Sequence, residues 1–236
     1  MCTITFIPKS NQSFILTSNR DEAPGRDSFP PELYEENGMK FLFPKDAVAG
    51  GTWIGLSERK RVVCLMNGGF VAHERKSFYR KSRGVVVKEF LKAENLKSKI
   101  KNYDFNDIEP FTIVFIEWAN NLSLYQLVWD GVEYHFSEEP LAPQIWSSYP
   151  LYPEALKKKR EQWFSEFLFK NLSPSEEQLL QFHKIAGEGD LLSNLVMDRG
   201  FVKTKSITQI VKNDNSTTMR YEDLQLGKVS NSIFGN

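Results

Sequence analysis

Short apolar runs alternate with polar turns along most of the chain, starting at its first residues. Segments 3–8 (TITFIP) and 14–18 (FILTS) are rich in β-branched and aromatic residues, and the polar stretch KSNQS separates them. Two such runs around a polar turn predict a β-hairpin. Residue 2 is therefore expected at the very start of the first strand.

The same pattern predicts further strands and helices. The additional strands, which form successive hairpins, are expected at 50–57, 61–67, 111–118, 122–129, 205–212 and 217–224. Asp130-Gly131 predicts a type I′ turn into one more strand after the second of these hairpins. Helical spacing of apolar residues is present at 85–96 and 153–172.

A third helix is expected after the sequence SPSE (173–176), which we interpret as a capping box with Pro174 at the first helical position, and it ends near Gly187. Residues 23–50 are rich in Pro, Gly and charge and predict a long irregular loop. The tail after Gly227 is expected to fray. Antiparallel hairpins with two or three helices between them favour an α+β layered fold in a single domain, residues 1–236.

Composition narrows the class of protein. Lys plus Arg is 30 and Asp plus Glu is 30, so the formal net charge is zero and a general nucleic-acid partner is not expected. The basic runs KKKR (157–160) and RKSR (80–83) are interpreted as solvated faces. No run is long and apolar enough for a membrane span, and no signal peptide opens the chain, so we expect a cytoplasmic protein.

Cys2 is the first candidate for chemistry. Removal of Met1 would expose a residue that carries both a thiol and an α-amine. Their ordinary pKa values, about 8.5 and about 7.7–8.0, are close enough for the amine to act as base toward the thiol. The alternative is an ordinary second residue that starts a strand.

The sequence NRDE (19–22) stands at the end of the second predicted strand, and a hairpin brings that end back beside Cys2. Arg20 could lower the thiol pKa or hold a substrate carboxylate. Asp21 could orient the α-ammonium, and Asn19 or Glu22 could simply cap the turn. A solvated polar turn without catalytic role is the alternative.

Other polar residues carry weaker signals. Asn67 ends a predicted strand before two glycines, which suits either an oxyanion donor or a turn residue. Cys64 lies inside an apolar run and is expected to be a buried structural thiol. His73, His135 and His183 are scattered, so a Cys-His hydrolase lacks a local signature. Two cysteines without a CxxC pair give no metal site.

Three segments together resemble the NRDE family, also known as the transport and Golgi organisation 2-like family. They are MC at the start, SNRDE (18–22) and GGTWIGLS (50–57), supported by RVVCLMNGG (61–69) and KTKSIT (203–208). That family is similar to cysteine N-terminal-nucleophile (Ntn) hydrolases such as penicillin V acylase and bile salt hydrolase. The resemblance implies a four-layer αββα sandwich with two antiparallel sheets, and cleavage of linear C–N amide bonds.

The resemblance also implies roles for residues. Cys2 would be nucleophile and base in one residue, with Asp21 orienting its amine, Arg20 supporting the thiolate and Asn67 donating to the oxyanion. Two positions depart from the acylases. Ser148 is found where they have a second oxyanion Asn, and Lys205 is found where they have an Arg late in the sequence. Lys keeps the charge of Arg but loses its bidentate fork.

Two functions are therefore expected. The first is an amidohydrolase that acts on a small molecule through a Cys2 thioester, without a cofactor. The second is a non-catalytic protein that binds or moves a hydrophobic small ligand on the same fold. In either case the residues expected to contact the small molecule are Asn19, Trp53, Ser148 and Lys205. The sequence does not indicate an oligomeric state.

Overall fold

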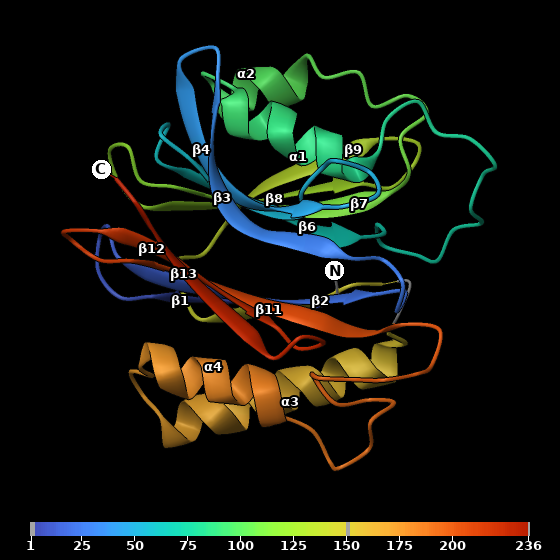
Figure 1. Cartoon of the computed structure of the whole chain (residues 1–236), viewed down its shortest axis with the longest axis vertical. Coiled ribbons are helices and arrows are strands. Elements are labelled where there is room, and N and C mark those ends of the chain that lie inside the picture. Colours follow the sequence, from blue (N-terminus) through green and yellow to red (C-terminus); the bar gives the residue numbers. More distant parts are fainter. Residues whose placement is uncertain (1–2, 150–151, 236) are drawn as a thin grey trace. The chain divides into compact units, whose positions relative to one another are not determined.

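A computed structural model describes residues 3–149 and 152–235 of the chain (Figure 1). It divides into two compact units. The first unit combines residues up to Arg26 with those from Ala142 onward, and the second unit is Asp27–Leu141. Each unit consists of one antiparallel sheet and two helices. The expected single domain stays a prediction.

The first unit is a six-stranded sheet in the order β10-β1-β2-β11-β12-β13, antiparallel throughout. Its strands are β1 (Thr3–Pro8), β2 (Phe14–Glu22), β10 (Gln144–Ser147), β11 (Lys203–Lys212), β12 (Thr217–Asp223) and β13 (Lys228–Phe234). The hairpins predicted at both ends of the chain are confirmed, and they meet because β2 pairs with β11. The central strands of this unit thus come from opposite ends of the sequence.

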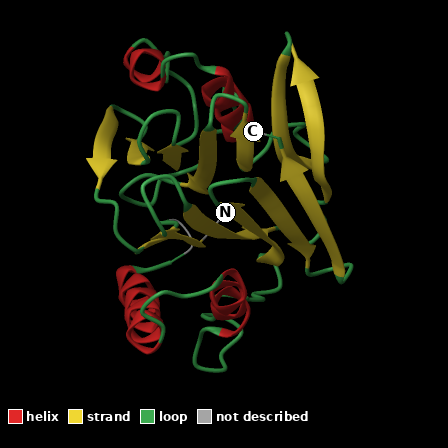
Figure 2. Cartoon of the chain, turned by 90° about the vertical axis from the view of Figure 1, so that its left-hand side faces the viewer, coloured by secondary structure: helices red, strands yellow, loops and turns green. Residues whose placement is uncertain are grey.

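Helices α3 (Glu154–Lys170) and α4 (Glu176–Ile185) cover one face of this sheet (Figures 1 and 2). The apolar contact is made by alternate strand residues, Ile7, Ile15 and Val211, against Phe164 and Phe182 of the helices. Alternation follows from the period of two in a strand. The residues between them, including Ile4, Phe6 and Leu16, point to the opposite face and are also buried.

The second unit is a seven-stranded antiparallel sheet whose strands follow chain order from β3 to β9. They are β3 (Ser28–Glu36), β4 (Met39–Asp46), β5 (Ile54–Ser57), β6 (Arg61–Asn67), β7 (Phe111–Glu117), β8 (Ser123–Trp129) and β9 (Tyr134–Glu139). Helices α1 (Arg83–Lys92) and α2 (Leu96–Lys101) pack on one face, where Phe90, Phe111 and Phe115 belong to the core. The helix predicted at 85–96 is confirmed up to Lys92, where α1 ends, and α2 is an addition.

The irregular loop predicted over residues 23–50 is wrong. Strands β3 and β4 form a hairpin there, closed by Asn37 and Gly38 with φ of 55° and 75°. Two positive φ values in succession fit a type I′ turn, for which Asn-Gly is the preferred pair. The prediction failed because the prolines were interpreted as loop residues. β3 is an edge strand, where Pro is tolerated, and its register shifts between Phe29 and Glu32.

Three smaller predictions also need correction. The tail after Gly227 is strand β13, because its backbone forms a full ladder with β12 although most of its side chains are exposed. The capping box of α4 is made by Ser175 with Gln178, two residues later than expected. At Asp130-Gly131 only the glycine has a positive φ, so that turn is not type I′. No helix in the described ranges is both long and apolar enough to cross a membrane.

Candidate functional site

The register of the first hairpin decides what lies near the start of the chain. Thr3 pairs with Asn19 across β1 and β2, and Ser147 of β10 pairs with Thr3 from the other side. The hairpin predicted from the sequence therefore brings NRDE beside the first described residue. Cys2 itself lies outside the described residues, but it is the residue bonded to Thr3 in the chain.

Alternation along β2 separates the members of NRDE. Asn19 and Asp21 point to the face covered by α3 and α4, whereas Arg20 points to the opposite face. Asn19 is fully buried, and its amide nitrogen donates to the carbonyl oxygens of Leu195 (2.8 Å) and His183 (3.3 Å). Asn19 thus ties β2 to the helical layer and does not cap a turn.

Asp21 is a buried carboxylate with donors on both oxygens. The Thr204 hydroxyl donates to Oδ1 at 2.6 Å, and the Tyr152 hydroxyl donates to Oδ2 at 2.5 Å. Thr204 is the partner of Asp21 in the β2–β11 ladder. Hydrogen bonds to a carboxylate are about twice as strong as neutral ones. Two other segments of the first unit therefore fix the orientation of this carboxylate.

Arg20 is 3% exposed, and its Nη1 donates to the carbonyl oxygen of Arg26 at 3.2 Å. It pairs with Ser206 in β11. Its burial contradicts the alternative of a solvated polar turn, since Asn19 and Asp21 are buried as well. A cation held inside the fold at this position suits the support of a nearby anion.

The two departures from the acylase pattern occupy defined positions. Lys205 is the extra residue of a β-bulge in β11, and its Nζ donates to the carbonyl oxygen of Pro24. Ser148 directly follows Ser147, the partner of Thr3. The Ser148 hydroxyl is buried and has no hydrogen-bond partner among the described residues. A buried orphan hydroxyl is unusual and calls for a functional or solvent partner.

The second unit holds the remaining predicted residues, Asn67 and Trp53. Asn67 is half-buried and ends β6, as expected, and Gly68 follows it with φ of 83°. The Gly68 backbone is held at both polar groups: its N–H donates to the carbonyl oxygen of Pro110 and its carbonyl accepts from Thr112. Trp53 is buried just before β5, and its carbonyl accepts from the backbone N–H of Leu65.

The motif GGTWIGLS, which contains Trp53, has a packing role of its own. A Cβ on Gly51 would lie 2.7 Å from the backbone carbon of Gly84, at the start of α1. Thr52 donates from its backbone to the carbonyl oxygen of Gly84 at 3.3 Å. Gly50 has φ of 66°, a conformation that favours glycine. The two glycines thus let the segment before β5 approach α1.

A buried arginine was missed by sequence reasoning. Arg160 belongs to the run KKKR, which was interpreted as a solvated face, yet it is fully buried in α3. Its guanidinium donates to the Thr3 hydroxyl and to the carbonyl oxygen of Asn194 at 2.9 Å. The helical period offered a signal, because Arg160 is four residues before the buried Phe164 and so lies on the same stripe.

Tyr152 and His183 were missed as well. The Arg160 guanidinium lies 3.6 Å from the centre of the Tyr152 ring. His183 of α4 bridges β1 and β2: its Nδ1 is 2.6 Å from Oδ1 of Asn19, and its Nε2 is 2.7 Å from the Thr5 hydroxyl. Burial, and then the Arg160 cation, lower the pKa of His183 to about 3. A neutral ring with both nitrogens engaged is a poor general base.

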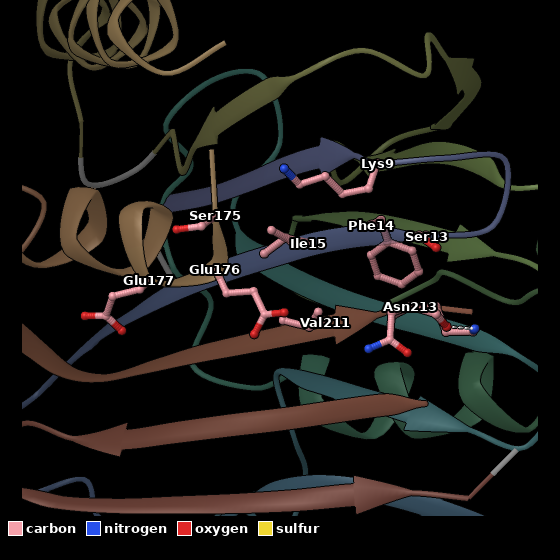
Figure 3. A pocket seen from close by; sticks show the side chains of 10 residues that line it. Lys9, Ser13, Phe14, Ile15, Ser175, Glu176, Glu177, Val211 and Asn213 are labelled. Carbon is pink, nitrogen blue, oxygen red and sulfur yellow. Dashed lines mark hydrogen bonds between the residues drawn. The ribbon is translucent and has the colours of Figure 1, made fainter. Parts of the chain in front are cut away.

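The first unit also has a hollow at the other end of its hairpin. It has a volume of about 420 Å³ and is lined by Lys9, Ile15, Glu176 and Val211, among others (Figure 3). Lys9 is at the end of the hairpin remote from Thr3. None of the residues predicted to be functional lines this hollow.

In the second unit, the ligand atoms of Asp130, Glu133 and His135 lie within 4.8 Å of one another and could approach one metal ion. The three residues are partly or largely exposed. The His135 Nε2 is 2.9 Å from an Asp130 carboxylate oxygen, so a local ion pair explains the cluster.

The sequence of the whole chain matches one family. The family described as Transport and Golgi organisation 2 covers residues 1–234. The chain belongs to this family. The family resemblance predicted from MC, SNRDE and GGTWIGLS is therefore confirmed. No curated protein matches the chain.

Solved structures of Ntn hydrolases share its fold. A variant of conjugated bile acid hydrolase from Clostridium perfringens has a TM-score of 0.60 at 9% identity, covering 98% of this chain and 92% of that one. Penicillin V acylase from Agrobacterium tumefaciens gives 0.58 at 10% identity, with 99% and 86% covered. The Caenorhabditis elegans ortholog of N-acylethanolamine-hydrolyzing acid amidase gives 0.61 at 12% identity, with 99% and 100% covered. The predicted α+β Ntn-hydrolase-like αββα fold, with two antiparallel sheets, is confirmed.

Proposed function

We propose that this member of the Transport and Golgi organisation 2 family is an Ntn-type amidohydrolase that cleaves a linear C–N amide bond of a small molecule. The nucleophile is the Cys2 thiol, exposed by removal of Met1. The observation that carries the proposal is the pairing of Thr3 with Asn19, because it brings the buried carboxylate of Asp21 to the strand that Cys2 precedes.

The reaction uses one residue as nucleophile and base. The α-amine of Cys2 takes the thiol proton, and the thiolate attacks the amide carbon. The C–N bond then breaks, the leaving amine takes the proton from the α-ammonium, and a thioester remains. Water, deprotonated by the α-amine, attacks the thioester carbon. The C–S bond then breaks, a carboxylic acid is released, and the thiolate takes the proton back from the α-ammonium. Amide plus water thus gives acid plus amine, and no cofactor is consumed.

Polar residues of the first unit support this chemistry. We propose that Asp21 accepts a hydrogen bond from the α-ammonium, in addition to those from Tyr152 and Thr204. Arg20, a buried cation, favours the thiolate. The orphan hydroxyl of Ser148, next to the partner of Thr3, is a donor to the oxyanion.

The remaining assignments rest on the family resemblance. Asn67, which ends β6 of the second unit, is proposed as the other oxyanion donor. Asn19, Trp53 and Lys205 are proposed to contact or shape the substrate. The names of the structural neighbours favour N-acyl compounds as the first substrates to test, since they include an acylase and an N-acylethanolamine-hydrolyzing amidase.

The direct test is a panel of N-acyl amides incubated with the protein and with its Cys2→Ala variant. Intact mass spectrometry first establishes whether Met1 is absent from the purified protein. We expect release of free amine by the parent protein and no release by Cys2→Ala. Complete retention of Met1 in protein purified from its own cells would contradict the mechanism.

Thiol labelling separates catalysis from simple ligand binding. Cys64 is fully buried in β6, so iodoacetamide should modify it only after unfolding. We expect rapid labelling of Cys2 in the native protein, slowed about tenfold or more in Arg20→Ala, because a buried cation lowers a thiol pKa by one unit or more. Equally slow labelling of both cysteines would instead favour the non-catalytic, ligand-binding function.

A further inference from the structure

Arg160 is a buried cation that has no acidic partner among residues 3–149 and 152–235. Its side chain is fully buried, and its hydrogen bonds go to the Thr3 hydroxyl and to the carbonyl oxygens of Ser193 and Asn194. None of the ion pairs among the described residues includes Arg160. An isolated buried charge is strongly unfavourable, so the fold retains it for a reason beyond packing.

Tyr152 connects this cation to a negative charge. The guanidinium lies 3.6 Å from the ring centre, and the hydroxyl of the same ring donates to Asp21. Tyr152 is itself fully buried. Arg160, Tyr152 and Asp21 therefore form a chain of contacts that starts at the hydroxyl of Thr3 and ends at Thr204.

Two residues of this series of contacts are linked to the proposed nucleophile. Thr3 is bonded to Cys2, and Asp21 is the residue proposed to hold the α-amine of Cys2. In addition, the cation bonded to Thr3 and the aspartate carboxylate have opposite effects on a nearby amine, because a cation favours its neutral form and an anion favours its charged form.

We propose that Arg160 and Tyr152 are positioning residues of the nucleophile. Arg160 fixes Thr3, and Tyr152 fixes Asp21. The Cys2 amine is thereby held in place, neutral at pH 7 but still able to accept the thiol proton. This inference rests on the proposed function, since it assigns the amine of Cys2 the role of base. It extends the site from β2 into the helical layer.

Other charged groups face the same region, and they contribute equally in the parent protein and in the variants compared below. The Arg199 guanidinium lies 5.2 Å from the centre of the Tyr152 ring, and His183 is neutral at pH 7 because its pKa is lowered to about 3. The neighbouring strands also carry Arg20, Glu22, Lys203 and Lys205. All of these stay unchanged in Arg160 and Tyr152 variants.

The chain offers a matched control. His183 is also a fully buried polar residue of the helical layer, and it contacts Thr5, two residues along β1 from Thr3. Its other side-chain hydrogen bond is with Asn19, and none of its hydrogen bonds among the described residues involves Asp21. A purely structural role for such contacts should make His183→Gln and Tyr152→Phe behave alike.

The test measures the rate of Cys2 alkylation by iodoacetamide against pH, in the full chain with Cys64→Ala. An N-terminal tag removed by a protease leaves Cys2 as the first residue, so the result is independent of natural Met1 removal. Tyr152→Phe keeps the ring under Arg160 and removes the hydroxyl that donates to Asp21. Arg160→Met removes the cation, and Arg160→Lys restores the charge without the fork.

We expect Tyr152→Phe and Arg160→Met to move the midpoint of the pH–rate profile upward by about one unit, because each leaves the negative charge of Asp21 less compensated and so favours the protonated forms of the Cys2 amine and thiol. Arg160→Lys should recover part of the shift, and His183→Gln should leave the midpoint in place while lowering Tm. The same midpoint in Tyr152→Phe as in the parent, or an equal shift in His183→Gln, would overturn the proposal.

Turnover is measured separately. If the midpoint shifts as expected but no N-acyl amide is cleaved, the positioning role stands and the proposed hydrolase function fails. If amides are cleaved but the midpoint stays in place, the hydrolase function stands and the positioning role fails. If Arg160→Met does not fold, Tyr152→Phe alone decides the outcome.

Discussion

The Tyr152 hydroxyl donates to Oδ2 of Asp21 at 2.5 Å, on the far side of the carboxylate from the bond with Thr204 to Oδ1. One aspartate of the NRDE sequence therefore joins β2 to β11 and to the segment that leads into α3. Because all three residues are buried, this carboxylate stabilises the first unit whether or not it takes part in a reaction.

Asp21→Asn is expected to lower stability as well as activity. The amide oxygen can accept one of the two hydrogen bonds, but its NH₂ group then faces a hydroxyl, and hydrogen bonds to charged groups contribute about 1.5–3 kcal/mol each. We expect a loss of about 2–4 kcal/mol, which is a fall in Tm of roughly 5–12 °C for a chain of this size. Differential scanning calorimetry measures it, with the exposed Glu161→Gln of α3 as control. Equal Tm values for the two variants would contradict the structural role.

Ser148→Ala is expected to lower activity without lowering stability. Its buried hydroxyl has no partner among the described residues, so Ser148→Ala removes an unsatisfied group and should change the free energy of unfolding by less than about 0.5 kcal/mol. If the hydroxyl stabilises the oxyanion, the same variant should lose about 100-fold in kcat. Urea denaturation and steady-state kinetics measure the two effects. A large loss of stability with unchanged kcat would show a structural hydroxyl instead.

The period of two along the strands made much of the fold predictable. In β1 and β2 it predicted the hairpin that brings NRDE beside Thr3, and in β5 and β6 it placed Asn67 at a strand end. Three short motifs then identified the family across a chain whose structural neighbours are only 6–12% identical to it in sequence. These signals are local, because each depends on residues close together in the sequence.

The interactions around Asp21 were not predictable in the same way. Tyr152 and Thr204 are 131 and 183 residues from Asp21 in the sequence, and no pattern of alternation reports such a contact. Arg160 was hidden in a basic run, although its helical position among buried aromatic residues was readable. Strand β3 was missed because its prolines were weighed as loop signals, whereas an edge strand tolerates them.

The glycines of GGTW give a prediction for the second unit. Gly51→Ala places a methyl group 2.7 Å from the backbone of Gly84, and backbone cannot move aside as a flexible side chain can. We expect a loss of about 1–3 kcal/mol in the free energy of unfolding, as for overpacked cores. Gly25→Ala is the control, since nothing lies within 4 Å of the added carbon. Indistinguishable denaturation midpoints would mean that β5 and α1 separate at no cost.

His183 predicts how stability depends on pH. Its folded pKa of about 3 lies below the ordinary value of about 6.5, so the fold favours the neutral ring. The unfolded chain takes up a proton as the pH falls through about 6.5, while the folded protein does not until about pH 3. The contribution of His183 is therefore fully present above about pH 7 and decreases as the pH falls, by about 1.4 kcal/mol at pH 5.5.

His183→Gln should remove this dependence while keeping polar contacts near Asn19 and Thr5. The measurement is the free energy of unfolding by urea at pH 7.5 and at pH 5.5. We expect the difference between the two pH values to be about 1.4 kcal/mol smaller in the variant than in the parent protein. His135→Gln serves as control, because its ring is 40% exposed and stands in the second unit. If the control and the variant change by the same amount, the titration of a buried His183 does not govern the stability of the first unit at mildly acidic pH.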